Sequence, residues 1–86
     1  MNNMAEQISE VDAAINRLNE IQEDATVPKN VRTKIESIIG TLKEAAELSI
    51  KVNKAFNGLD EISSDVNLQS YTRTQIWNIM SVLEKL

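Results

Sequence analysis

Residues 59–83, LDEISSDVNLQSYTRTQIWNIMSVL, decide the fold of this chain, because residues 18–42, LNEIQEDATVPKNVRTKIESIIGTL, are an earlier version of the same stretch. Shifting one stretch onto the other by 41 positions pairs nine identical residues, among them Asp24 with Asp65 and Arg32 with Arg73. The sequence therefore predicts a doubled unit. Repeat one covers about residues 4–44 and repeat two about residues 45–86, within a single domain spanning 1–86.

In four segments of the sequence, apolar residues recur three and four positions apart, and this spacing places them on one face of a helix. These apolar stripes run through residues 4–21, 31–42, 48–62 and 76–83. The first helix is predicted to end near Asp24–Ala25, because Pro28 follows and proline disrupts a helix interior. A turn is predicted at 63–68, with Thr26 and Asn67 as the N-caps of the helices after the two turns.

The join between the second and third helices is less well marked, because residues 41–52 contain neither proline nor glycine. The repeat predicts a break near Ala45–Ser49, and the alternative is one long central helix covered by a second chain. With the break, the predicted fold is all-α: a four-helix up-and-down bundle made of two tandem helix hairpins. Gly40 is expected to mark close packing between helices.

The composition argues against several classes of function. The chain has 13 acidic and 9 basic residues and a pI of about 4.7, so its field repels nucleic acids and anionic membranes. It has no cysteine and no histidine, which removes the usual nucleophile, general base and transition-metal ligands. Neither a membrane span nor a signal peptide is predicted, so we expect a cytoplasmic, non-enzymatic protein without cofactors.

Charged residues at the two turns oppose the helix dipole, with acidic residues at helix ends and Arg32 or Arg73 at the following helix starts. The structural interpretation is an ion pair across each turn, Asp24 with Arg32 and Asp65 with Arg73. The functional alternative is that each arginine, beside free helix N–H groups, binds a small anion or a nucleotide. A bound metal is not predicted, because the carboxylate-rich helices lack the histidines of bundle metal sites.

Tyr71 and Trp77 are the only tyrosine and tryptophan, and the repeat pairs them with the polar residues Asn30 and Glu36. Trp77 lies one position away from the apolar stripe of its helix. One interpretation is that Trp77 widens the core. The other is that Tyr71 and Trp77 form a surface for a partner protein or a homodimer, since tryptophan is enriched at such surfaces.

The motifs at and around the two turns are residues 59–62, Asp65, 72–74, 76–78, Glu20–Ile21, Glu23–Asp24, Val27–Pro28, Asn30 and Arg32. They resemble those of a small uncharacterised family of archaeal proteins, and the resemblance covers nearly the whole chain. This chain departs from that family in the second turn, where Val66 and Gln69 stand in place of prolines. The resemblance implies a four-helix up-and-down bundle in a cytoplasmic archaeal protein, and it implies no known activity.

The function predicted from these observations is that of a non-enzymatic helical module that binds another protein or a second copy of itself. The alternative is a binder of small anions or nucleotides at Arg32 and Arg73.

Overall fold

Four amphipathic segments form four helices in the computed structural model, which describes residues 4–86. They are α1 (Met4–Glu23), α2 (Lys29–Lys43), α3 (Leu48–Ser63) and α4 (Ser70–Glu84). The prediction of an all-α four-helix bundle is confirmed. Residues 1–3 lie outside the part of the chain that the structure describes. They belong to the N-terminal stretch in which no signal peptide is predicted.

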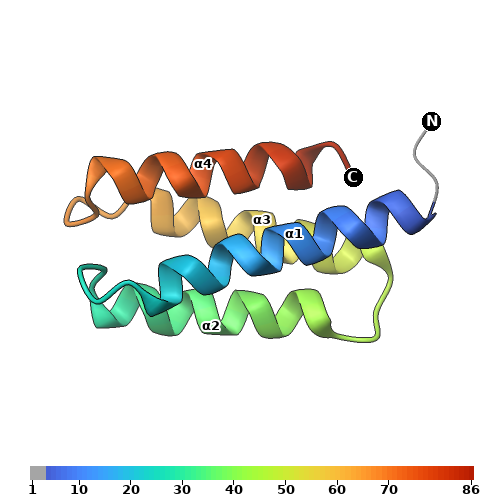
Figure 1. The fold of residues 1–86 in the computed structure, drawn as a ribbon, viewed down its shortest axis with the longest axis horizontal. Helices are drawn as coiled ribbons and strands as arrows, with labels where there is room; N and C mark the ends of the chain where they lie inside the picture. The colour runs from blue at the N-terminus through green and yellow to red at the C-terminus, as the bar shows by residue number, and fades with distance from the viewer. Residues whose placement is uncertain (1–3) are drawn as a thin grey trace.

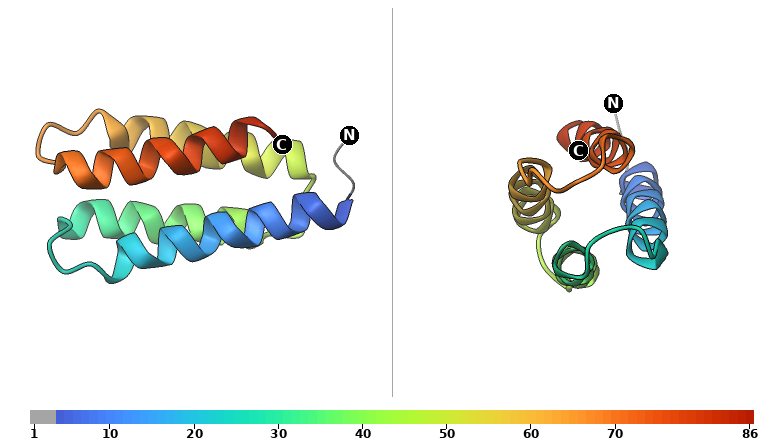
Figure 2. Two further views of the ribbon diagram at one scale, coloured as in Figure 1. Left: turned by 45° about the horizontal axis from the view of Figure 1, so that its top comes forward. Right: turned by 90° about the vertical axis from the view of Figure 1, so that its left-hand side faces the viewer.

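The helices form a ring in which each contacts its neighbours in the chain and α4 returns to contact α1. Figure 2 shows this ring end-on, with one helix at each corner. The turns that join α1 to α2 and α3 to α4 lie at the same end of the bundle, and the α2–α3 connection lies at the other end (Figure 1). The bundle measures 37 × 22 × 19 Å.

The two hairpins bury their residues in the same register. Apart from Ile15, whose counterpart Phe56 is half-buried, every buried residue has a buried counterpart 41 positions away. The pairs are Val11/Val52, Ala14/Ala55, Leu18/Leu59, Ile21/Ile62, Val27/Leu68, Val31/Thr72, Ile35/Ile76, Ile38/Ile79, Ile39/Met80 and Leu42/Leu83. Both halves thus contribute to one core in equivalent ways.

The predicted break between the second and third helices is confirmed. α2 ends at Lys43 and α3 begins at Leu48, so residues 44–47 form a short connection. This connection reverses the chain direction and brings α3 against α2. The alternative of one continuous central helix is therefore wrong.

The predicted N-caps are wrong. α2 has Pro28 and α4 has Gln69 at the N-cap position, and neither side chain makes a capping hydrogen bond. Instead, the backbone N–H groups of Thr26 and Asn67 donate to Oδ1 of Asp24 and Asp65, each at 2.9 Å. Aspartate accepts from the backbone two residues on in a local turn. This turn delays each helix start beyond the predicted cap.

The expected close packing at Gly40 is also wrong. A Cβ atom placed on Gly40 has no neighbour within 4 Å, and the residue is exposed. The close approach occurs instead at Gly58, where a Cβ atom would lie 3.0 Å from Cδ1 of Ile38. α2 and α3 therefore pack tightly at Gly58, and Gly40 faces open space.

Replacing Gly40 by alanine is expected to stabilise the protein by about 1 kcal/mol, because alanine has the higher helix propensity and meets no neighbour here. Urea denaturation of both proteins measures this change. The matched control is Gly58→Ala, in which the added methyl group must displace Ile38 and the gain is expected to vanish. A destabilised Gly40→Ala variant contradicts the prediction.

Candidate functional site

The side chain of Arg73 connects the two ends of the second turn. Its Nε donates to the backbone carbonyl of Ser63 at 2.9 Å, and its Nη2 donates to that of Asp65 at 2.7 Å. The last carbonyl groups of a helix lack partners within the helix, and they carry the negative end of its dipole. Arg73 lies in the first turn of α4, but its charge lies at the end of α3. This placement offsets the unfavourable interaction between the charge of Arg73 and the dipole of α4 that the order of residues in the sequence predicts.

The first turn is arranged differently around its arginine. Nε of Arg32 donates to the backbone carbonyl of Val27 at 3.1 Å. The carboxylate of Asp24 accepts two hydrogen bonds from Thr26, at 2.9 Å from the backbone N–H and 2.6 Å from the hydroxyl. Arg32 thus stabilises the turn that precedes its own helix through a single hydrogen bond.

These contacts bear on both interpretations of the turns. The structure brings Arg73 to Asp65, but the acceptor is the backbone carbonyl and not the predicted carboxylate. Arg32 lies near enough to Asp24 for its charge to act on that carboxylate. The anion site stays a prediction, and an anion would have to compete with carbonyl groups already bound to each guanidinium group.

Hydrogen bonds from the hydroxyl and then the backbone N–H of Thr26 hold the pKa of Asp24 below its ordinary value, and Arg32 adds to the effect. A lowered pKa means that the carboxylate contributes stability above its unfolded pKa and loses it as the pH falls through the folded pKa. Replacing Thr26 by valine is expected to raise the pKa of Asp24, as measured by NMR titration of the carboxyl carbon.

The matched control is Thr33→Val, which removes a hydroxyl that donates to the Lys29 carbonyl and should leave Asp24 unchanged. An unchanged pKa of Asp24 in the Thr26→Val variant contradicts the prediction.

Tyr71 and Trp77 both lie at the surface, with 69% and 53% of their areas exposed. The interpretation of Trp77 as a core residue is therefore wrong. A helix turns about 100° per residue, so Trp77 lies that far from the buried Ile76, and Tyr71 and Trp77 lie about 120° apart. They point to different sides of α4, and a partner surface at either residue stays a prediction.

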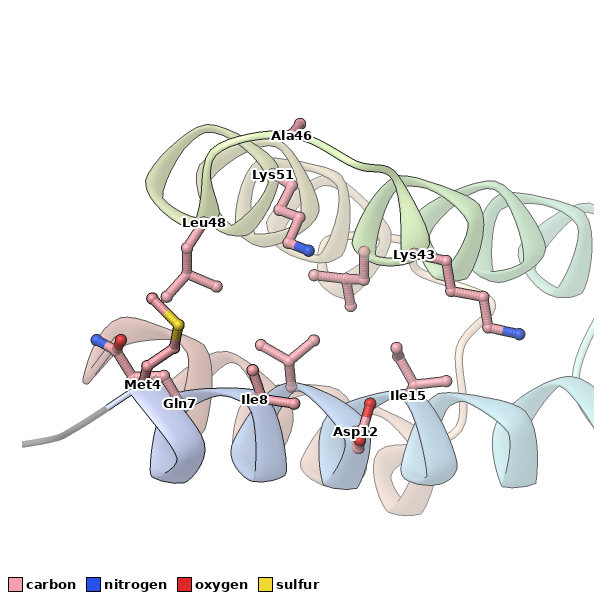
Figure 3. A pocket seen from close by; sticks show the side chains of 11 residues that line it. Met4, Gln7, Ile8, Asp12, Ile15, Lys43, Ala46, Leu48 and Lys51 are labelled. Atoms are coloured by element: carbon pink, nitrogen blue, oxygen red, sulfur yellow. The ribbon is translucent and has the colours of Figure 1, made fainter.

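An apolar groove of about 460 Å³ lies at the end of the bundle away from the two turns. We call it the α1–α3 groove. One wall comes from α1, and the other comes from the end of α2, the connection and the start of α3 (Figure 3). It is lined by Met4, Gln7, Ile8, Val11, Asp12, Ile15, Leu42, Lys43, Ala46, Leu48 and Lys51.

The groove arises from unequal helix lengths. α1 has 20 residues, whereas α2 and α3 have 15 and 16. The first turns of α1 extend beyond the end of α2 (Figure 1), so its apolar stripe continues where its neighbours have ended. Met4 and Ile8 remain 76% and 56% exposed there, while Val11 and Ile15 below them are buried.

Charged groups border this apolar surface on both walls. Figure 3 shows Asp12 on the α1 wall, and Lys43 and Lys51 on the opposite wall. Nζ of Lys51 donates to the backbone carbonyl of Glu44 at 3.3 Å, which holds the lysine beside the connection. The groove therefore has an acidic and a basic side along an apolar floor.

Sequence reasoning missed the groove, although a signal for it was present. The shift of 41 that matches the buried residues pairs Met4 with Ala45 and Ile8 with Ser49. Apolar residues in one half thus correspond to small or polar residues in the other. Such unmatched apolar residues mark positions that the shared core does not require.

Residues 4–86 show neither a metal site nor a membrane span. In this part of the chain no group of three or more carboxylates is placed to hold a metal ion. Within the same residues, none of the helices has the length and apolar character that crossing a bilayer requires.

Comparison with known proteins gives two matches. The family described as "Uncharacterised protein family (UPF0147)" matches residues 1–86. The crystal structure of a protein of unknown function, MMP1188, superposes with a TM-score of 0.86 at 38% sequence identity, covering 98% of this chain and 93% of that one. No curated protein matches the chain. The matches are to a family and a structure without an assigned activity.

Proposed function

The chain belongs to the uncharacterised protein family UPF0147, and since this membership brings no activity with it, we propose from its surface that it is a non-enzymatic module that binds protein through the α1–α3 groove. The observation that carries the proposal is the exposure of Met4 and Ile8 over an apolar floor. Contiguous exposed apolar surface rimmed by polar residues is typical of interaction sites.

The residues of the groove suit the binding of a protein better than the catalysis of a reaction. Its charged residues are one aspartate and two lysines on opposite walls, and the chain has no histidine or cysteine to act as base or nucleophile. An open apolar channel with charges along its edges matches the apolar centre and polar rim of a protein interface.

A cytoplasmic location stays a prediction.

Site-specific photo-crosslinking in cells of the source organism tests the proposal. A photoreactive amino acid is placed at Ile8 in the groove, at Ile50 on the outer side of α3, or at Trp77 on α4. Ile50 is a matched control, because it is also an isoleucine and is 50% exposed against 56% for Ile8.

We expect protein conjugates from position 8 and none from position 50. Conjugates from position 77 alone would overturn the groove and favour the surface at Trp77. The absence of conjugates from every position would overturn the interaction function itself.

A further inference from the structure

We propose that the α1–α3 groove is occupied by the same groove of a second copy of this chain, which makes the protein a two-fold symmetric dimer. This inference rests on the proposed function, because it names the protein that the groove binds. Two-fold dimers use one self-complementary surface patch on both copies. The groove has the features that such a patch requires.

The patch contains both projecting side chains and a recess that can receive them. Met4 and Ile8 project from the first turns of α1, with most of their area exposed. The recess beside them is lined on its opposite wall by Leu42 from α2 and Leu48 from α3. Two copies facing each other can place the projecting residues of each over the recess of the other, which removes apolar surface from water in both.

The charges on the two walls are also self-complementary. A two-fold axis that runs along the groove places the α1 wall of each copy against the opposite wall of the other. Asp12 then faces the basic wall that carries Lys43 and Lys51, and the contact forms twice (Figure 3). Complementary charges of this kind set the register and the choice of partner. They also offset locally the repulsion between two chains that each carry a net charge of −4.

The size of the patch sets the expected affinity. A standard interface takes roughly 800 Å² from each partner, which is about one seventh of the 5456 Å² surface of this chain. The groove and its rim occupy one end of the bundle, so the interface falls at or below this size. We therefore expect a reversible dimer with a dissociation constant of about 1 to 100 µM.

Sedimentation equilibrium of the full chain, at concentrations up to about 1 mM, measures this association. Wild-type protein is expected to approach twice the monomer mass of 9.6 kDa. Replacing Ile8 by glutamate should raise the dissociation constant about 10- to 100-fold, because a buried apolar contact is lost and a charge takes its place. Ile50→Glu, at a similarly exposed isoleucine outside the groove, should leave the constant unchanged.

Charge reversal tests the orientation of the two copies. Asp12→Lys and Lys51→Glu should each weaken the dimer roughly three- to tenfold, and the double variant should restore it. Lys51→Glu also removes the hydrogen bond to the Glu44 carbonyl, so circular dichroism is needed to confirm that each variant is folded. Restoration in the double variant requires the opposite charges to face each other and cannot come from the loss of that hydrogen bond.

A wild-type chain that remains monomeric at about 1 mM overturns the dimer. Equal weakening by Ile8→Glu and Ile50→Glu also overturns it, because the groove would then have no special part in the association. If the chain is monomeric and position 8 crosslinks to a different protein, the dimer fails and the proposed function stands. If the chain is monomeric and no position crosslinks, both fail.

Discussion

Replacing Leu18 by alanine is expected to lower the free energy of unfolding by about 3 kcal/mol. Leu18 is fully buried where α1 meets the rest of the core, so the change loses apolar contact and leaves a cavity. A domain of this length has roughly 4 to 13 kcal/mol of stability in total. The variant should therefore unfold at a much lower urea concentration than the wild type.

The counterpart residue Leu59 in α3 is equally buried, so Leu59→Ala should cost about the same. Lys54→Ala, on the exposed side of α3, is the surface control and should change stability by less than about 0.5 kcal/mol. A difference between the two leucine variants of more than about 2 kcal/mol would show that the two halves do not share the core equally.

Replacing Arg73 by glutamine is expected to lower the free energy of unfolding by about 2 kcal/mol. The change removes two charge-assisted hydrogen bonds, and it leaves the carbonyl group of Ser63 without its side-chain donor, whereas that of Asp65 keeps the Leu68 N–H. Arg32→Gln removes a single bond to Val27 and should cost about half as much. Thermal and urea unfolding in phosphate-free buffer measure both effects.

The variant Arg73→Lys distinguishes a structural role of Arg73 in the turn from a role in binding an anion. Lysine keeps the charge but lacks the rigid fork that reaches both carbonyl groups, so it should restore less than half of the lost stability. An anion site predicts the opposite pattern: stability little changed by Arg73→Gln without ligand, and a loss of the thermal shift that phosphate produces in the wild type.

The helices of this protein follow directly from local patterns in the sequence. The stripe from Met4 to Ile21 predicted α1, and the proline after Val27 predicted its end to within two residues. The break at residues 44–47 contains neither proline nor glycine, yet the repeat placed it correctly. Periodicity succeeds here because each helix buries one face, and the residues of that face are apolar whatever lies opposite them.

The candidate sites followed much less closely from the sequence. The repeat identified Arg73 as a turn residue, but the carbonyl groups that it binds belong to the last residue of α3 and to the turn after it. Trp77 is next to the apolar stripe in the sequence, and only the packing of Ile76 and Met80 into the core shows that it remains outside.

The sequence by itself determined which residues form helices, where the chain turns and which faces are buried, because these depend on local spacing and backbone chemistry. Tertiary structure alone decided where the apolar face of α1 lacks a neighbour. α1 is longer than α2 and α3, so Met4 and Ile8 extend past the end of the core and border the α1–α3 groove. Whether the end of an apolar face is covered depends on what other helices place opposite it, and the spacing of residues along one helix does not contain that information.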